Sequence, residues 1–202
     1  MAAALGAGYN VFEPNGQLIV DIGGGTTEVA VISLGGIVVS ESIRITGDEM
    51  DTCIINHCKK NYNLLIGERI AERIKLQLGS VLPFKVEQSM EVTGRDLLTG
   101  MPKTFTISSM EIRDSIEEVV KSIITAIRRT LEMTPPELSS DIYQNGITIT
   151  GGGALLSGLA EYISKEMGLN VIIANDPLSC VALGTGIVLN SLDDYVDRII
   201  FN

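Results

Sequence analysis

The chain has 202 residues, which suits one domain of ordinary size or one with a small insertion, and 45% of them are hydrophobic, enough for a sizeable core. Its 25 acidic and 15 basic side chains give a formal charge of −10, which argues against a nucleic-acid surface because phosphate binding needs clustered Lys and Arg. We therefore expect no nucleic-acid partner. The three cysteines form no CxxC pair and no stretch is as long as a membrane span, so we expect a cytoplasmic protein.

The first part of the chain predicts a helix fragment and three antiparallel strands. The helix fragment covers residues 1–8, where three alanines and a leucine favour helix. The strands cover residues 17–21, 28–34 and 37–45, which are rich in β-branched residues and separated by glycine-containing connections. Two consecutive hairpins are therefore expected.

The connection between the first two strands has the sequence DIGGGTTE and begins at Asp21. Its candidate phosphate ligands are three glycines and two threonines: Gly23, Gly24, Gly25, Thr26 and Thr27. Without a Cβ the glycine N–H groups can approach an anion, and we expect the glycines to adopt the positive φ of a tight hairpin. The two hydroxyls can donate as well, and Asp21 is placed to hold a hydrated Mg²⁺. The alternative is a glycine-rich turn without a ligand.

Residues 47–106 predict a smaller inserted α+β subdomain. Asp48 is expected to cap a helix of roughly three turns. A second helix is expected over residues 67–78, where isoleucines share one face and charged residues another. Residues 86–92 and 103–108 read as a pair of short strands around a glycine-containing turn.

The remainder of the chain predicts alternating helices and strands, over residues 109–132, 147–150, 155–167, 170–174 and 177–192. Parallel strands joined by helices need right-handed crossovers. By fold analogy, three antiparallel strands followed by this tail indicate an α/β, ribonuclease-H-like half-unit of the actin-like ATPases. The core subdomain would comprise residues 1–46 and 107–202.

A second glycine triplet follows the predicted strand at residues 147–150. Its candidate ligands are Gly151, Gly152, Gly153 and Ala154. We expect these residues at a helix N-terminus, where unpaired N–H groups and the helix dipole favour phosphate. Neither triplet matches GxxxxGK[ST] or GxGxxG, so neither a P-loop nor a Rossmann fold is supported.

Six segments together resemble the MreB family of bacterial actin-like rod-shape-determining proteins, in the family's order: DIGGGTTEVAVISLGGIV, RITGDEMD, NLLIGERIAERIK, TPPELSSDI, ITGGGALLSGL and DPLSCVALGTG. The resemblance runs from Met1 to about Leu192. It implies ATP and Mg²⁺ as cofactors and membrane-associated filaments that organise cell-wall synthesis. The implied partners are other copies of the protein and proteins of the cell-wall elongation machinery.

The resemblance also assigns the AERIK segment to the family's adenosine-contacting helix. Glu72 would then accept from the ribose hydroxyls, and Arg73 or Lys75 would lie near the base or the phosphates. From the charge pattern alone, these side chains form a solvated face. The family pattern has a first domain before this point, with another phosphate loop, a water-positioning glutamate and a membrane anchor. We therefore expect a truncated form with impaired hydrolysis, with indirect or lost membrane association, and with no catalytic residue of its own.

Two alternatives remain open at this point. The first is a sugar- or acetate-kinase-like or chaperone-like ATPase half of the same superfamily, which would share both glycine loops. The second is a nucleotide-independent interaction protein that acts through exposed apolar surface. The mean hydropathy of +0.29 is high for a chain with so few aromatic residues and indicates such an uncovered surface.

Overall fold

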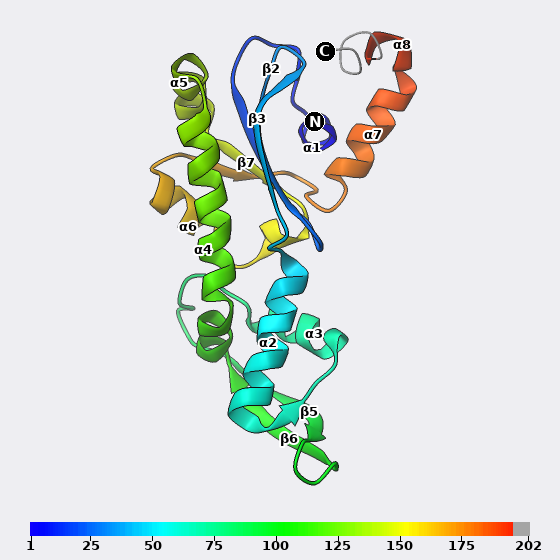
Figure 1. The fold of residues 1–202 in the computed structure, drawn as a ribbon, viewed down its shortest axis with the longest axis vertical. Helices are drawn as coiled ribbons and strands as arrows, with labels where there is room; N and C mark the ends of the chain where they lie inside the picture. The colour runs from blue at the N-terminus through cyan, green and yellow to red at the C-terminus, as the bar shows by residue number, and fades with distance from the viewer. Residues whose placement is uncertain (196–202) are drawn as a thin grey trace.

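The computed structural model describes residues 1–195, apart from the side chains of residues 193 and 194. The molecule is elongated, with a five-stranded sheet at one end and a three-stranded sheet at the other (Figure 1). Helices α2 (Gly47–Tyr62) and α4 (Ser109–Met133) run along the length of the molecule between the two sheets. The two ends of the molecule are thus built from different parts of the chain.

The five-stranded sheet has the order β3-β2-β1-β7-β8. Its strands are β1 (Gln17–Ile22), β2 (Thr27–Ser33), β3 (Gly36–Ile43), β7 (Ile147–Thr150) and β8 (Val171–Ile173). The first three pair antiparallel, whereas β7 is parallel to β1 and β8 is parallel to β7. The α/β class with three antiparallel and two parallel strands is therefore confirmed.

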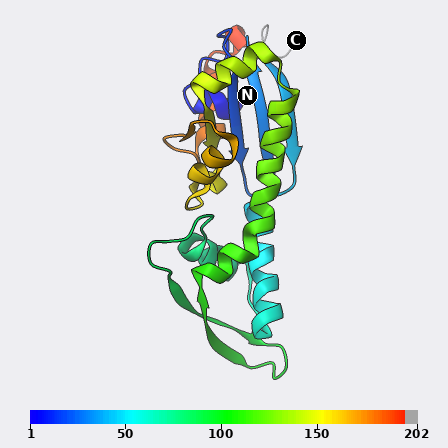
Figure 2. The same ribbon diagram turned by 90° about the vertical axis from the view of Figure 1, so that its left-hand side faces the viewer.

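Alternate residues of the sheet pack on different helices. Val20 and Val29 belong to the larger apolar cluster, which includes residues of α4 and of α6 (Leu159–Met167). Ile19 belongs to a smaller cluster on the other face, with the alanines of α1 (Ala2–Gly6). Helix α7 (Cys180–Asn190) packs along α1. Figure 2 shows α4 running beside the strands of the sheet. With α4 on one face and α1 and α7 on the other, the sheet is covered on both faces.

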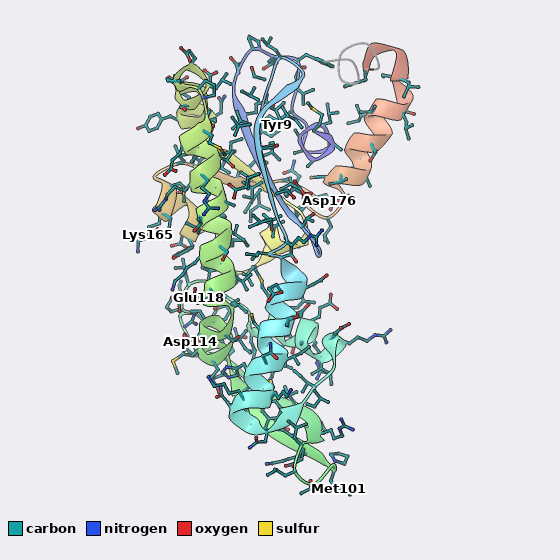
Figure 3. All side chains as sticks on the ribbon, viewed as in Figure 1. Tyr9, Met101, Asp114, Glu118, Lys165 and Asp176 are labelled. Atoms are coloured by element: carbon teal, nitrogen blue, oxygen red, sulfur yellow. The ribbon has the colours of Figure 1, made fainter. Side chains whose placement is uncertain are left out.

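The three-stranded sheet has the order β4-β5-β6. It consists of β4 (Leu64–Leu65), β5 (Ser89–Asp96) and β6 (Pro102–Ser108), with α3 (Glu68–Leu78) beside it. Figure 3 places Met101 at the far tip of the β5–β6 hairpin. One apolar cluster continues from β1, β2 and β7 of the five-stranded sheet through α2, α3 and α4 to Phe105 in β6. The division into subdomains at residues 46 and 107 stays a prediction.

The predicted N-cap of α2 was wrong, and one helix in the middle of the chain was not predicted. The N-cap of α2 is Thr46 rather than Asp48, because the Thr46 hydroxyl and the Asp48 N–H both donate to the Gly24 carbonyl. Helix α5 (Pro136–Asn145) was not predicted, since it begins at a pair of prolines: Pro135 is its N-cap and Pro136 is its first residue. Proline in the first helical turn loses no hydrogen bond, so this pair begins a helix as well as ending one.

The helices near the carboxyl end are shorter than expected. The helix predicted over residues 155–167 is a 3₁₀ turn, η1 (Gly152–Leu155), followed by α6 after Gly158. The helix predicted over residues 177–192 is α7, followed by the short α8 (Leu192–Tyr195). Within residues 1–195, no helix combines the length and apolarity needed to cross a membrane.

Large apolar side chains are exposed on β8, on α7 and in the loop between them. We call this the α7–β8 apolar surface, and it comprises Ile172, Ile173, Leu178, Val181, Leu183, Ile187 and Leu189. Leu178 and Leu189 are each 70% exposed. Exposed apolar side chains, as the mean hydropathy indicated, are therefore present on β8, which is an edge strand of the five-stranded sheet, and on α7, which packs along α1.

Candidate nucleotide-binding cleft

A cleft of about 500 Å³ lies between the two ends of the molecule. Of the site residues predicted from the sequence, six line it: Gly23, Gly24, Glu72, Lys75, Gly152 and Gly153. They come from the β1–β2 connection, from α3 and from the turn after β7. Three segments that are far apart in the sequence thus meet at one concave surface, which is the usual form of a ligand site.

The β1–β2 connection forms the first wall of the cleft. The Gly23 N–H donates to the Thr26 carbonyl at 2.9 Å and closes the turn. None of the three glycines has a positive φ, so that expectation was wrong. A Cβ added at Gly25 would meet no atom within 4 Å, and one at Gly24 would meet only the Asp48 carboxylate, at 3.3 Å. The fold itself therefore does not require glycine at these two positions.

In this connection the backbone carbonyls of Gly23 and Gly24 are hydrogen-bonded to the protein, whereas two backbone N–H groups have no acceptor among the described residues. The start of α2 binds its carbonyls: the Gly47 N–H donates to the Gly23 carbonyl and the Asp48 N–H to the Gly24 carbonyl. Within residues 1–195, no protein group accepts a hydrogen bond from the N–H of Gly24 or Gly25. Backbone N–H groups without an acceptor beside an open cleft are suited to bind an anion.

The two threonines of the connection differ. Thr27 is buried and its hydroxyl donates to the Ile45 carbonyl at 2.7 Å, which holds the end of the second hairpin. Thr26 is exposed at the turn. Of the two predicted hydroxyl ligands, only Thr26 is an exposed residue, and the Thr27 hydroxyl is already bound within the protein.

Asp21 lies at the end of β1, beside the end of β7. Its Oδ1 accepts a hydrogen bond from the Thr150 hydroxyl at 2.9 Å, and the side chain is partly exposed. In the described part of the chain, no cluster of three or more His, Cys, Asp or Glu side chains could hold a metal. A single carboxylate fits Mg²⁺ only when water and ligand phosphates complete the octahedron, so the assignment of Asp21 stays a prediction.

The second glycine triplet packs tightly against the end of β1. Gly151 has a φ of +79°, and its N–H donates to the Pro177 carbonyl at 2.9 Å. An added Cβ would lie 2.3 Å from the Ile22 carbonyl oxygen at Gly151 and 2.2 Å from Ile22 Cγ2 at Gly153. Ala154, which follows, is buried. Gly151 and Gly153 are therefore required by the packing of the loop on β1.

The prediction that the second glycine triplet lies at the N-terminus of an α-helix was wrong. The glycines lead into the four-residue turn η1, and the α-helix starts only at Leu159 because Gly158 has a φ of +78°. The N–H groups of Gly152 and Gly153 nevertheless have no acceptor within residues 1–195. Any attraction for phosphate at this loop therefore comes from individual N–H groups.

Helix α3 forms the wall opposite the glycines. Glu72 and Lys75 line the cleft, whereas Arg73 is exposed and does not. The Lys75 Nζ donates to Asp51 Oδ2 at 2.7 Å and to the Gly47 carbonyl at 2.9 Å. Burial raises the pKa of Asp51 despite this ammonium. The sequence analysis missed Asp51, because its partner lies on another helix and no local pattern signals the pair.

The chain matches the family model described as MreB/Mbl protein over residues 1–197. It is 48% identical over 196 residues to the cell shape-determining protein Mbl of Bacillus subtilis (strain 168), covering 97% of this chain and 59% of that relative. It is 51% identical over 193 residues to the cell shape-determining protein MreB of Escherichia coli (strain K12), covering 96% of this chain and 56% of that relative. The chain thus spans less than two thirds of the length of these relatives.

Solved structures show the same fold. The structure of MreB5 of Spiroplasma citri bound to AMPPNP matches with a TM-score of 0.91 and 43% identity, over 97% of this chain and 59% of that one. The MamK double helical filament matches with a TM-score of 0.77 and 23% identity, over 94% of this chain and 57% of that one. The second likeness concerns the fold alone. Both confirm the predicted actin-like architecture.

Proposed function

Because the chain belongs to the MreB/Mbl family, we propose that it binds ATP with Mg²⁺ in the cleft and serves in filaments that determine cell shape. The observation that carries the proposal is the meeting of both glycine turns with Glu72 and Lys75 around one cleft. The family match favours this function over a kinase-like or chaperone-like ATPase.

The chemistry of the two walls supports a nucleoside triphosphate. The glycine turns offer N–H groups without protein acceptors, which suits phosphate oxygens. Across the cleft, Glu72 can accept from ribose hydroxyls and Lys75 carries a positive charge. The MreB5 structure with AMPPNP shows that a protein of this fold holds such a ligand.

The metal in this proposal is Mg²⁺ bound through ATP. When bound, Mg²⁺ neutralises charge on the phosphates. Asp21 would hold it from the end of β1, with Thr150 orienting the carboxylate through their 2.9 Å hydrogen bond. The described residues form no cluster of three or more potential metal ligands, so metal binding should depend on the nucleotide.

For hydrolysis, we propose that these residues are insufficient alone. Phosphoryl transfer needs charge neutralisation on both sides of the phosphates and a residue that positions water. The relatives contain sequence beyond the matched segment, and a second wall from such a domain, in the same chain or a separate one, would complete the site. The α7–β8 apolar surface supports this, because large exposed apolar patches mark interaction sites.

Filament assembly with other copies, association with cell-wall elongation proteins and indirect membrane attachment complete the proposal. Family membership supports these three properties. The MamK double helical filament shows that an actin-like fold can assemble into a filament. The second candidate function is docking of a partner without nucleotide. The α7–β8 apolar surface favours it, and binding of a partner unchanged by ATP would identify it.

The proposal is tested by calorimetric titration of the chain with ATP, with and without Mg²⁺. We expect weak, Mg²⁺-dependent binding and negligible turnover, and we expect Lys75→Met to weaken the binding. The matched control is Lys121→Met, since Lys121 lies on the exposed face of α4 among Glu117 and Glu118. Absence of binding by the wild-type chain contradicts the proposal, and sugar-dependent turnover would restore the kinase-like alternative.

Assembly is tested by ATP-dependent sedimentation of the chain, alone and with a co-expressed first domain of a relative. We expect pelleting to require both the domain and ATP. Replacing Leu183 on α7, which is 52% exposed, by Asp should abolish co-purification of the domain. The control is Met101→Asp at the tip of the distant hairpin, 65% exposed, which should leave co-purification intact.

A further inference from the structure

Asp51 is a buried carboxylate just outside the cleft lining. Its Oδ2 accepts from Lys75, while its Oδ1 is buried and accepts no hydrogen bond within residues 1–195. The charges of Glu72 and Asp48 add to burial in raising the Asp51 pKa. A buried ion pair with an unpartnered oxygen adds little to stability, because desolvation offsets the attraction. Stability alone therefore does not explain this pair.

The Lys75 ammonium is held from two sides. Asp51 Oδ2 and the Gly47 carbonyl accept from it at 2.7 and 2.9 Å, and its side chain is only 16% exposed. An ammonium has three N–H donors, so one remains for a ligand in the cleft that Lys75 lines. A flexible lysine side chain is thereby fixed in one position beside the cleft.

The same contacts connect α3 to the first glycine turn. Lys75 holds the Gly47 carbonyl, and the Gly47 N–H donates to the Gly23 carbonyl at 3.3 Å. The next N–H, of Asp48, donates to the Gly24 carbonyl at 3.2 Å. A continuous chain of hydrogen bonds thus runs from Asp51 through Lys75 and the start of α2 to the turn.

We propose that Asp51 is a positioning residue that fixes the Lys75 ammonium and, through Gly47, ties helix α3 to the β1–β2 glycine turn, so that it controls nucleotide affinity without touching the nucleotide. The inference rests on the proposed binding of ATP in the cleft. Asp51 reaches both walls of the cleft through Lys75, its only described hydrogen-bond donor, because Lys75 lies on α3 and also donates to Gly47, whose N–H donates to Gly23 in the turn.

The test is a double-mutant cycle on the full chain, with ATP affinity measured by calorimetry. Asp51→Asn removes the charge and nearly preserves the shape, and should weaken ATP binding about tenfold, the loss typical of removing a partner that orients a binding group. Lys75→Met should weaken binding at least as much. In the Lys75→Met background, Asp51→Asn should have no further effect, because its influence passes through the ammonium.

Glu41 provides a matched control. It is also a carboxylate with one oxygen in an ion pair, to Arg129, and the other buried without a hydrogen-bond donor in residues 1–195, but it lies on β3 outside the cleft lining. Glu41→Gln should leave ATP affinity unchanged. If Asp51→Asn does not fold, as judged by circular dichroism, the smaller Asp51→Ser replaces it in the cycle.

The outcomes separate the two proposals. Failure of the wild-type chain to bind ATP overturns the proposed function. Wild-type binding with unchanged affinity in the Asp51 variant overturns only the positioning role. Equal losses from Asp51→Asn in the wild-type and Lys75→Met backgrounds also overturn it, because a general structural effect would then be acting independently of Lys75.

Discussion

The two glycine triplets look alike in sequence and differ in what their glycines do. At Gly151 and Gly153 an added Cβ would lie within 2.3 Å of atoms of Ile22, so packing against β1 demands glycine. At Gly25 an added Cβ would meet no atom within 4 Å, at Gly24 it would meet only the side-chain carboxylate of Asp48, at 3.3 Å, and neither glycine has a positive φ. A glycine that neither packing nor backbone conformation requires is best explained by a ligand that must approach closely.

The largest expected effect is on folding, at the second triplet. Gly153→Ala should lower the free energy of unfolding by roughly 3 kcal/mol, because its Cβ would collide with Ile22 Cγ2 in the core. Chemical denaturation measures this loss. Gly152→Ala is the control, since its Cβ would meet only the end of the exposed Leu178 side chain, at 3.2 Å. If both variants lost the same free energy of unfolding, the contact between Gly153 and Ile22 would not explain the need for glycine at position 153.

At the first triplet the expected effect is on binding instead. Gly24→Ala should reduce ATP affinity about tenfold or more, which corresponds to about 1.4 kcal/mol, because the Cβ keeps the phosphates from the backbone. Its free energy of unfolding should change by no more than about 0.5 kcal/mol. Gly67→Ala, where an added Cβ would meet no atom within 4 Å, should alter neither quantity. Unchanged affinity in Gly24→Ala would show that the turn is not a phosphate site.

Thr46 tests whether α2 shapes the first turn. Its hydroxyl is buried and donates to the Gly24 carbonyl. Thr46→Val should therefore lower the free energy of unfolding by about 1 kcal/mol and weaken ATP binding as well. Thr130→Val is the control: the Thr130 hydroxyl is also buried and donates within α4, far from the cleft. A loss of stability without any loss of affinity would mean that the turn holds its shape unaided.

The smallest effect is on the pH dependence of stability. The Asp51 pKa is raised in the folded protein, mainly by burial and further by Glu72 and Asp48, and the Lys75 ammonium opposes the shift. The folded state therefore binds the Asp51 proton more tightly than the unfolded state. This contribution to stability is complete below the ordinary Asp pKa of about 4 and is lost as pH rises through the raised value. Asp51→Asn should flatten the stability profile in this window, and an unaltered profile would contradict the assignment.

Most elements were predictable because local sequence determines them. Runs of β-branched residues identified β1 and β2. Isoleucines and valines that recur at helical spacing identified α4, whose start is fixed by the Ser108 and Glu111 capping box. The errors came from contacts between distant residues. Asp48 is a residue type favoured at N-caps, but the helix begins after Thr46, where the Gly24 carbonyl accepts hydrogen bonds from the Thr46 hydroxyl and the Asp48 N–H.

The candidate site was predictable only in part. Glycine triplets after strands have a local signature, so both turns were found. The sequence could not show which glycines serve the fold, because Ile22 packs on Gly153 from a segment far away. Nor could it show that Lys75 faces the cleft with Asp51 behind it while Arg73 faces outward, since that depends on how α2 and α3 pack.

The most direct test of the central claim is an amide NMR titration of the full chain with ATP and Mg²⁺. We predict that the amide signals of Gly24, Gly25 and Gly152 shift together with those of α3 around Lys75, because all of them surround one ligand. Signals of the β5–β6 hairpin should stay in place. Shifts confined to other parts of the molecule, or no shifts at saturating ATP, would contradict the assignment of the cleft.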